Sequence, residues 1–255
     1  MAEFRRLLID THRLVEIYDI DQPLLLNSKE FHYLKRVLRL QKGDSFSLVD
    51  GQGKLWQAIF QGENEVFLTT TFKNALQTLP RSKPLLGIAV AIPKRGFDDV
   101  LRMSTEIGID IIQPLSSERS FFKKSSNSRF QRWQTIIREA VEQSERLWAP
   151  KLLEITDLRD FIKISSGYPL GIATTRDLAL KNCNDWLNQI DFNVKEIWIA
   201  IGPEGGWTVE EEALASGFGS VAIEMGTTIL RTSTAAIVAT QNMALRRRTG
   251  NLSIN

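Results

Sequence analysis

The sequence predicts an α/β protein in which a largely parallel sheet follows a smaller β-rich segment. After residue 84, apolar strands alternate with helices, a pattern typical of parallel sheets. We expect these strands at 85–92, 109–112, 170–173, 197–201 and 221–225. Ahead of them, turn residues separate short β-like stretches at 46–49, 55–60 and 66–72. The segment 79–84 contains two prolines and is typical of a linker, so we predict domains at 1–78 and 79–255.

The composition is that of a globular protein with enough apolar material for a buried core, at 43% hydrophobic and 24% charged residues. No apolar run is long enough to cross a bilayer, and the N-terminus lacks the apolar core of a signal peptide. Cys183 is the single cysteine, which excludes intramolecular disulfides, so we expect a cytoplasmic protein with no membrane partner. The two histidines, His12 and His32, lie in unrelated segments without ligand spacing, and we expect no metal site.

Basic residues are concentrated in two stretches, although the net charge is only +2. Residues 119–138 contain six basic side chains and no acidic one, and residues 29–42 contain five against one. Aromatic residues lie within both stretches, at Phe31, Tyr33, Phe121 and Phe122. A solvated face would explain either stretch alone. Because two such stretches with aromatic neighbours favour phosphate contacts and base stacking, we predict RNA as the partner.

Two glycine-rich blocks near the C-terminus predict a ligand pocket. Residues 199–207 read Ile-Ala-Ile-Gly-Pro-Glu-Gly-Gly-Trp, and residues 225–235 read Met-Gly-Thr-Thr-Ile-Leu-Arg-Thr-Ser-Thr-Ala. In each block an apolar strand enters a glycine bend and then a helix start, and glycine lets the backbone approach a ligand closely. Thr208 and Glu211 have the spacing of a capping box, which supports a helix after the first bend. Two ordinary strand–turn–helix connections are the alternative interpretation.

Together the blocks resemble the ribosomal RNA small subunit methyltransferase E family, which belongs to the SPOUT class of S-adenosylmethionine-dependent RNA methyltransferases. That family pairs a Gly-Pro-Glu-Gly-Gly block with a Leu-Gly-x-Arg-Ile-Leu-Arg-x-Glu-Thr-Ala block. The matching positions here are Gly202, Pro203, Glu204, Gly205, Gly206, Gly226, Ile229, Leu230, Arg231, Thr234 and Ala235. The chain departs at Thr228, where the family usually has Arg, and at Ser233, where it often has Glu.

Further segments extend the resemblance over most of the chain. Residues 32–44 match a segment of a small PUA-like domain that helps relatives to hold RNA. Residues 94–120 match the family's Lys-Gly, Thr-Glu-Leu-Gly and Ser-Glu-Arg pattern, with Met103 where many relatives carry Lys. In the first of these segments the side chains expected to pack inward are Leu34, Val37, Leu38 and Leu40, and those expected to face outward are Lys35, Arg36 and Arg39.

The family's Glu-Ala-x-Glu-Gln-Ser-x-Arg signature is matched from Glu139 to Arg146. We interpret this polar strip as one that faces the RNA or the active-site cleft. Structural support of the fold is the competing role, and an i,i+4 pair between Glu142 and Arg146 would by itself stabilise the helix by about 0.3–0.5 kcal/mol.

The resemblance implies a SPOUT domain with a C-terminal trefoil knot, preceded by a PUA-like β-barrel domain. It implies a homodimer that methylates 16S ribosomal RNA, in a small-subunit particle, with S-adenosylmethionine as donor and no metal. The implied target is N3 of a uridine, at family position 1498. Because N3 carries a proton and lies on the Watson–Crick edge, the target must be unpaired or extruded, and a base or a cation must assist loss of the proton.

The residues expected at the site fall into three sets. The catalytic candidates are Arg231, Glu204, Glu142 and Arg119, of which Arg231 is the first choice for orienting RNA or stabilising the uracil anion. The candidates for binding S-adenosylmethionine are Thr174, Ile201, Gly202, Pro203, Glu204, Gly205, Gly206, Met225, Gly226, Ile229 and Leu230. The candidates for binding RNA are Lys35, Arg36, Arg39, Lys94, Arg119, Lys123, Lys124, Arg132 and Arg146. No general base is assigned.

Two other classes of function stay open at the level of sequence. An RNA-binding protein of the same fold with a degenerate, weakly active or inactive site would keep the basic surfaces without the chemistry. A nucleotide-phosphate enzyme is suggested only by glycine bends at helix starts. It is disfavoured because neither Gly-x-x-x-x-Gly-Lys-[Ser/Thr] nor Gly-x-Gly-x-x-Gly occurs.

Overall fold

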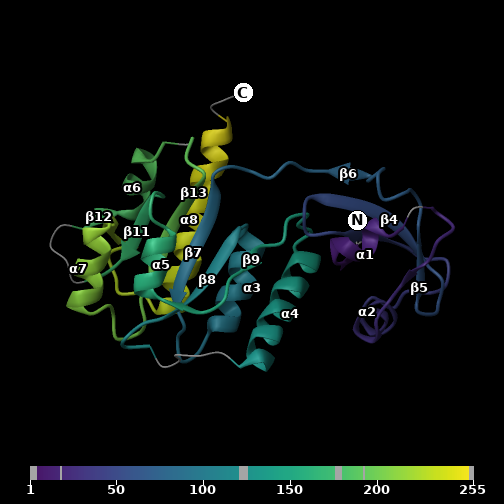
Figure 1. Ribbon diagram of the computed structural model, residues 1–255, viewed down its shortest axis with the longest axis horizontal. Coiled ribbons are helices and arrows are strands. Elements are labelled where there is room, and N and C mark those ends of the chain that lie inside the picture. The colour runs from purple at the N-terminus through teal and green to yellow at the C-terminus, as the bar shows by residue number, and fades with distance from the viewer. Residues whose placement is uncertain (1–4, 18, 121–125, 176–179, 192, 253–255) are drawn as a thin grey trace. The chain divides into compact units, whose positions relative to one another are not determined.

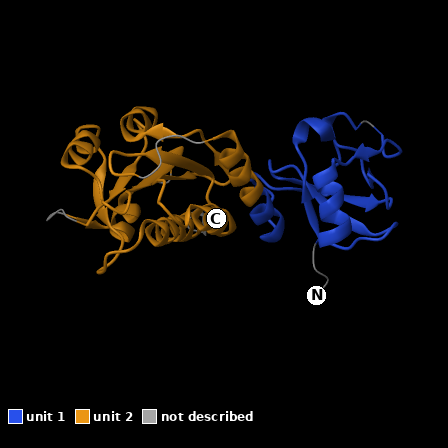
Figure 2. Cartoon of the chain, turned by 90° about the horizontal axis from the view of Figure 1, so that it is seen from below, with its two compact units in different colours: residues 1–81, 138–149 blue, residues 82–137, 150–255 orange. Residues whose placement is uncertain are grey.

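The computed structural model describes residues 5–17, 19–120, 126–175, 180–191 and 193–252. The chain divides into two compact units, coloured blue and orange in Figure 2. Unit 1 comprises residues 1–81 together with 138–149, and unit 2 comprises residues 82–137 and 150–255. A segment from the middle of the chain therefore belongs to the unit that holds the N-terminus. Within the described ranges, every helix is too short or too polar to cross a bilayer.

The described part of unit 1 is built on a six-stranded sheet, in the order β1-β3-β4-β5-β2 with β6 paired to β4. Its strands are β1 (Arg6–Leu8), β2 (Leu24–Leu25), β3 (Ser45–Val49), β4 (Lys54–Phe60), β5 (Glu65–Leu68) and β6 (Gln77–Thr78) (Figure 1). Strand β1 runs parallel to β3, and the other pairs are antiparallel. Trp56 and Phe60 are fully buried at the centre of the core. The three β-like stretches of the sequence are therefore strands β3, β4 and β5.

A helical segment with an unusual register carries most of the basic stretch at residues 29–42. Helix α1 (Thr11–Val15) precedes it, and the segment itself joins α2 (Ser28–His32) to a π-helix, η1 (Tyr33–Val37). Leu34 and Leu40 are fully buried, whereas Val37 is 60% exposed. The expectation that Val37 packs inward is therefore wrong. A π-helix closes its hydrogen bonds over five residues, so the usual helical period misplaces side chains within η1.

The C-terminal end of helix α4 (Asn127–Gln143) completes the edge of β1. The backbone N–H of Leu8 donates to Oε1 of Glu142 at 2.9 Å, and Nη1 of Arg138 donates to the carbonyl oxygen of Leu8 at 2.5 Å. Two side chains one helical turn apart thus satisfy the backbone groups that a neighbouring strand would otherwise pair. Glu142 is buried, and burial raises the pKa of its carboxyl from the usual 4.5 to about 7, against the opposing effects of the Leu8 hydrogen bond and the Arg138 charge.

Unit 2 holds, within the described ranges, an eight-stranded parallel sheet in the order β10-β8-β7-β13-β11-β14-β12, with β9 beside β8. Its strands are β7 (Leu85–Ala91), β8 (Ile111–Ser116), β9 (Lys151–Leu152), β10 (Thr156–Asp157), β11 (Leu170–Ala173), β12 (Lys181–Asn182), β13 (Glu196–Ile201) and β14 (Val221–Glu224). The predicted parallel sheet is confirmed, and the strand expected at 109–112 begins at Ile111 and runs to Ser116. The trefoil knot stays a prediction.

Helices form two layers in unit 2. Helices α5 (Leu158–Ile164) and α7 (Val209–Gly217) pack against a buried cluster that includes Trp198 and Ala200 of β13. In the other layer, α8 (Thr232–Leu252) contacts α3 (Phe97–Ile107), α6 (Cys183–Gln189) and strands β7 and β13. A buried ion pair between Arg247 and Asp110 anchors the end of α8, because Asp110 Oδ2 also accepts the backbone N–H of Leu86 at 2.9 Å.

The raised pKa of Glu142 predicts a measurable pH dependence of stability. Its pKa is higher in the folded chain than the usual 4.5, so the stability contributed by the neutral form is complete below pH 4.5 and is lost as pH rises through 7. Glu142→Gln stays neutral at every pH. The free energy of unfolding of this variant, relative to that of wild type, should therefore be about 1–3 kcal/mol higher at pH 8 than at pH 5. Chemical denaturation at both values measures this gain. Glu63→Gln, at an exposed position that is not among the causes of the Glu142 pKa, is the control, and equal pH slopes for wild type and Glu142→Gln would contradict the prediction.

Candidate functional site

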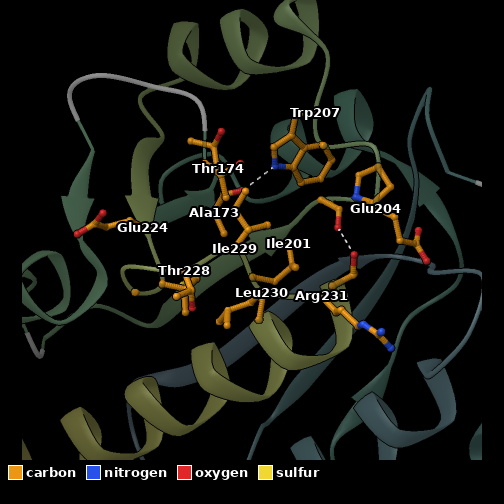
Figure 3. A pocket seen from close by; sticks show the side chains of 18 of the residues that line it. Ala173, Thr174, Ile201, Glu204, Trp207, Glu224, Thr228, Ile229, Leu230 and Arg231 are labelled. Carbon is orange, nitrogen blue, oxygen red and sulfur yellow. Dashed lines mark hydrogen bonds between the residues drawn. The ribbon is translucent and has the colours of Figure 1, made fainter.

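A cavity of about 620 Å³ lies where strands β11, β13 and β14 end at their carboxyl termini (Figure 3). Strand β11 pairs with both neighbours, so the loops that follow the three strands meet at one edge of the sheet. This edge is where parallel α/β sheets bind ligands. The lining residues are Ala173, Thr174, Thr175, Leu180, Ile201, Gly202, Pro203, Glu204, Gly206, Trp207, Glu212, Glu224, Met225, Gly226, Thr227, Thr228, Ile229, Leu230, Arg231, Thr232 and Ala235.

The two glycine blocks of the sequence share this cavity, as the pocket hypothesis requires. Of the residues expected to bind the donor, Gly205 does not line the cavity, and the other ten do. Trp207 and Thr232 also line the cavity and were not among the residues expected there, although both stand inside the blocks. Glu212 and Glu224 were missed because they lie on α7 and at the end of β14, where no pattern marked them.

Hydrogen bonds from side chains to backbone hold the three loops together. The indole Nε1 of Trp207 donates to the carbonyl oxygen of Ala173 at 3.0 Å, which ties the first glycine bend to the end of β11. The hydroxyl of Thr232 donates to the carbonyl oxygen of Gly202 at 2.9 Å, which ties the start of α8 to the same bend. Figure 3 draws both bonds around the cavity. Protein side chains therefore fix the wall of the cavity.

The glycines of the blocks serve different purposes. Gly206 has φ of +71° and Gly226 has φ of +152°, and a Cβ on either would meet no atom within 4 Å. These two positions therefore combine a backbone that favours glycine with open space beside the cavity. At Gly202, in contrast, an added Cβ would lie 3.1 Å from the Trp207 ring. Glycine at this position makes room for the indole.

Arg119 supports the first glycine bend, and the expectation that it is catalytic is not supported by its contacts. Its Nη1 donates to the carbonyl oxygens of Gly205 and Trp207, at 2.9 and 3.1 Å. Its Cβ and Cδ would lie 3.3 Å from a Cβ added to Gly205. Gly205 therefore faces Arg119 and not the cavity, which corrects its expected place in the lining.

The carboxylates around the cavity have different partners. Oε1 of Glu204 accepts the backbone N–H of Lys94 at 2.9 Å, so the Lys94 loop is attached to the first glycine bend. Oε1 of Glu212 accepts the hydroxyl hydrogen bond of Thr174 at 2.7 Å. For Glu224, the described part of the chain shows no hydrogen bond or ion pair to the carboxylate. Within the same part, no group of three or more metal-ligating side chains comes together.

The remaining candidates are spread over the chain. Arg231 lines the cavity with its backbone at the start of α8, and its side chain is exposed. Glu142 belongs to unit 1, where its carboxylate accepts the backbone N–H of Leu8. This contact favours the structural-support role, and the expected catalytic role stays a prediction. Arg132 pairs with Asp98 at 2.5 Å. Lys35, Arg36, Arg39 and Arg146 belong to unit 1, and Lys123 and Lys124 lie outside the described residues.

Comparisons with known proteins agree with this geometry. A family model described as RNA methyltransferase domain matches residues 81–244, and one described as RNA methyltransferase PUA domain matches residues 26–71. The ribosomal RNA small subunit methyltransferase E of Synechocystis is 37% identical over 226 residues, which cover 86% of this chain and 72% of that protein. Its counterpart from Rickettsia conorii is 32% identical and covers 95% of this chain and 96% of its own length.

Two of the solved structures similar to this chain cover nearly all of it. The ribosomal RNA small subunit methyltransferase E of Neisseria gonorrhoeae, bound to S-adenosylmethionine, has a TM-score of 0.76 at 27% identity and covers 95% of this chain and 97% of its own. A methyltransferase from Legionella pneumophila, in complex with the same cofactor, has a TM-score of 0.79 at 26% identity and covers 94% and 96%. The resemblance found in the sequence is thus confirmed, together with the PUA-like and SPOUT fold. The chain belongs to the ribosomal RNA small subunit methyltransferase E family.

Proposed function

We propose that this protein binds S-adenosylmethionine in the cavity of unit 2 and methylates N3 of a uridine in 16S ribosomal RNA. The observation that carries the proposal is the cavity itself, which is lined by both glycine blocks at the carboxyl ends of β11, β13 and β14. Membership of the family supports ribosomal RNA methylation as the general activity. The uridine and its N3 atom are the finer part of the proposal.

The charges of the lining fit this donor. The described lining residues include three carboxylates, Glu204, Glu212 and Glu224, and one cation, Arg231. The cavity therefore favours a ligand with positive charge and hydroxyl groups. When bound, S-adenosylmethionine supplies a methyl group on a sulfonium, together with an ammonium group and a ribose. The apolar part of the lining, including Ile201, Met225 and Leu230, suits its adenine. The same acidic lining disfavours a nucleotide phosphate, which argues against the nucleotide-phosphate alternative.

Arg231 is the residue we propose for stabilising charge on the target base. Its carbonyl oxygen accepts the backbone N–H of Ala235 at 2.8 Å, so its backbone is fixed in the first turn of α8. In Figure 3 its guanidinium points away from the centre of the cavity, on the same side as Glu204. From the rim it would meet the uracil carbonyl oxygens, where negative charge collects as N3 loses its proton. Glu204 stays the second catalytic candidate on this rim.

Unit 1 is proposed to hold RNA through Lys35, Arg36 and Arg39. All three lie on or just after η1, and the two arginines are exposed. Their buried neighbours Leu34 and Leu40 fix the segment in the core, so its cations are held at defined positions. Phosphate contacts made in this way supply affinity without sequence information.

A second copy of the chain and a small-subunit particle belong to the same proposal. Helix α8 leaves Leu245 50% exposed among half-buried apolar residues that include Ile237 and Val238. This surface suits a homodimer contact. We place the protein in the cytoplasm because its proposed substrate is ribosomal RNA. The alternative, an RNA-binding protein with a degenerate site, is favoured only by Thr228 and Ser233, which depart from the family pattern.

Mapping methylated uridines in 16S ribosomal RNA tests the function directly. Small subunits from cells that lack the protein should be missing one N3-methyluridine. Incubation with the purified chain and S-adenosylmethionine should introduce it. A methylated position other than uridine N3 would overturn the finer part of the proposal. If calorimetry detects no donor binding, the degenerate-site alternative stands instead.

Arg231→Ala should leave the affinity for S-adenosylmethionine nearly unchanged and lower single-turnover methyl transfer by roughly 10²-fold or more, the scale of losing one charge-stabilising donor. The measurement is methyl transfer at saturating RNA, beside donor affinity and a melting curve. Arg102→Ala, on the exposed face of α3, is the control. Joint loss of donor binding and thermal stability would mean that Arg231 is structural.

Arg119→Ala should weaken donor binding by roughly three- to tenfold, because it removes two charge-assisted hydrogen bonds to the bend that lines the cavity. Hydrogen exchange of the amides at 204–208 should accelerate in the same variant, and Arg119→Lys should recover part of both effects. A variant that binds the donor normally but loses RNA affinity would restore the expectation that Arg119 contacts RNA.

Neutralising the η1 cations should weaken RNA binding and leave donor binding unchanged. The variant replaces Lys35 and Arg36 with Ala and Arg39 with Gly, because the Arg39 backbone has a φ of 55° that favours glycine. The slope of log affinity against log salt should fall by about two to three. Replacement of the exposed Arg159 and Lys195 with Ala is the control. An unchanged slope would make η1 an ordinary solvated surface.

A further inference from the structure

We infer that Glu224 binds the ribose hydroxyls of the methyl donor and thereby selects a ligand with an intact ribose. This inference rests on the proposed function, because it assigns a ligand group to one wall of the same cavity. Glu224 is the last residue of β14, and it lines the cavity. Figure 3 shows it on the opposite side of the cavity from Arg231. It is therefore separate from the rim proposed for RNA.

The backbone of Glu224 is held firmly. Strand β14 lies between β11 and β12, and Glu224 pairs in register with Asn182 of β12. The residue before it, Ile223, is fully buried, and its carbonyl oxygen accepts the backbone N–H of Thr174 at 3.1 Å. Alternation along a strand turns the Glu224 side chain away from the face that Ile223 fills. The backbone of Glu224 is thus held at a defined place beside the cavity.

Glu224 differs from the two other carboxylates of the lining in its partners. Glu204 accepts the backbone N–H of Lys94, and Glu212 accepts the hydroxyl of Thr174. Both of these carboxylates therefore help to build the wall. Among the described residues, none forms a hydrogen bond or ion pair with the carboxylate of Glu224, although this residue is partly buried. A half-buried carboxylate without a protein partner is best satisfied by hydrogen-bond donors on the ligand.

The position of Glu224 in the chain points to ribose as the donor of those hydrogen bonds. In dinucleotide-binding βαβ units, a glycine-rich bend follows one strand, and an acidic residue about 20 positions later hydrogen-bonds a ribose hydroxyl. Here the order is β13, a glycine bend, α7 and β14, and Glu224 stands 22 positions after Gly202. Strand β11 lies between β13 and β14, but the carboxyl ends of all three strands open on the same cavity. The two oxygens of a carboxylate can accept from both hydroxyls of a vicinal diol.

The test is calorimetric binding of S-adenosylhomocysteine to the full chain, which reads affinity without turnover. Glu224→Ala should raise the dissociation constant by about tenfold or more, the effect of losing hydrogen bonds to a charged group, and Glu224→Gln should fall between it and wild type. Glu210→Gln is the matched control, because Glu210 is exposed at the start of α7 and does not line the cavity. It should bind like wild type.

Two altered ligands identify the group that Glu224 contacts. An S-adenosylhomocysteine analogue that lacks both ribose hydroxyls should bind equally to wild type and to Glu224→Ala, because the contact is already absent. The second ligand, 5′-methylthioadenosine, keeps the ribose and lacks the amino acid, so the penalty of Glu224→Ala should persist with it. Loss of the penalty with 5′-methylthioadenosine would assign Glu224 to the ammonium group and overturn the inference.

Failure of this inference is distinguishable from failure of the proposed function. If wild type binds S-adenosylhomocysteine and Glu224→Ala binds it equally well, Glu224 contributes nothing to the ligand, and only the inference falls. An equal penalty with the hydroxyl-free analogue would also overturn it, since the effect would then be structural or purely electrostatic. If wild type binds none of the three ligands, the proposed function falls as well.

Discussion

The position of β11 between β13 and β14 is the constraint on which the rest of the site depends. The two glycine bends follow β13 and β14, which are not neighbours in the sheet, and β11 pairs in parallel with both. The end of β11 therefore forms the third wall between the bends, and its Ala173 carbonyl is the acceptor for Trp207. Thr232 adds a bond from α8 to the first bend. A change in the pairing of β11 would separate the bends and remove both the cavity and its supports.

The glycine and carboxylate residues around the cavity have different structural roles, which the sequence motifs alone do not show. Gly206 and Gly226 leave open space at the wall, whereas Gly202 accommodates the Trp207 ring and Gly205 accommodates the side chain of Arg119. Among the carboxylates, Glu204 and Glu212 are bonded to protein groups. On their outer side the bends are held by hydrogen bonds from side chains, and on their inner side they form the surface of the cavity. Preorganisation of this kind lowers the conformational entropy that the loops lose when a ligand binds.

Elements that depend on local sequence patterns were predicted correctly. Contacts between residues far apart in the chain were not predicted. The parallel strands were found because buried strands are continuous apolar runs, as in β7 and β13. The shared cavity was found because glycine bends follow two of these strands. The two carbonyl acceptors of Arg119 were not predicted, because they lie more than 80 residues away in the chain, and its expected catalytic role stays a prediction. Val37 was misplaced because a π-helix breaks the period on which the prediction depends.

Glu142 illustrates how a polar family signature can arise from the needs of the backbone. A buried carboxylate is costly, and the raised pKa of Glu142 records that cost. An unpaired N–H at a buried strand edge is also costly, and Glu142 removes this second cost by accepting from Leu8. Arg138 completes the arrangement at the carbonyl oxygen of the same residue. An apolar residue in place of Glu142 would avoid burying a carboxylate but would leave the Leu8 N–H unpaired. A helix that covers the edge of β1 therefore requires polar side chains one turn apart. Signature residues on such a helix are therefore explained by contacts to the strand as well as they are by contacts to a substrate.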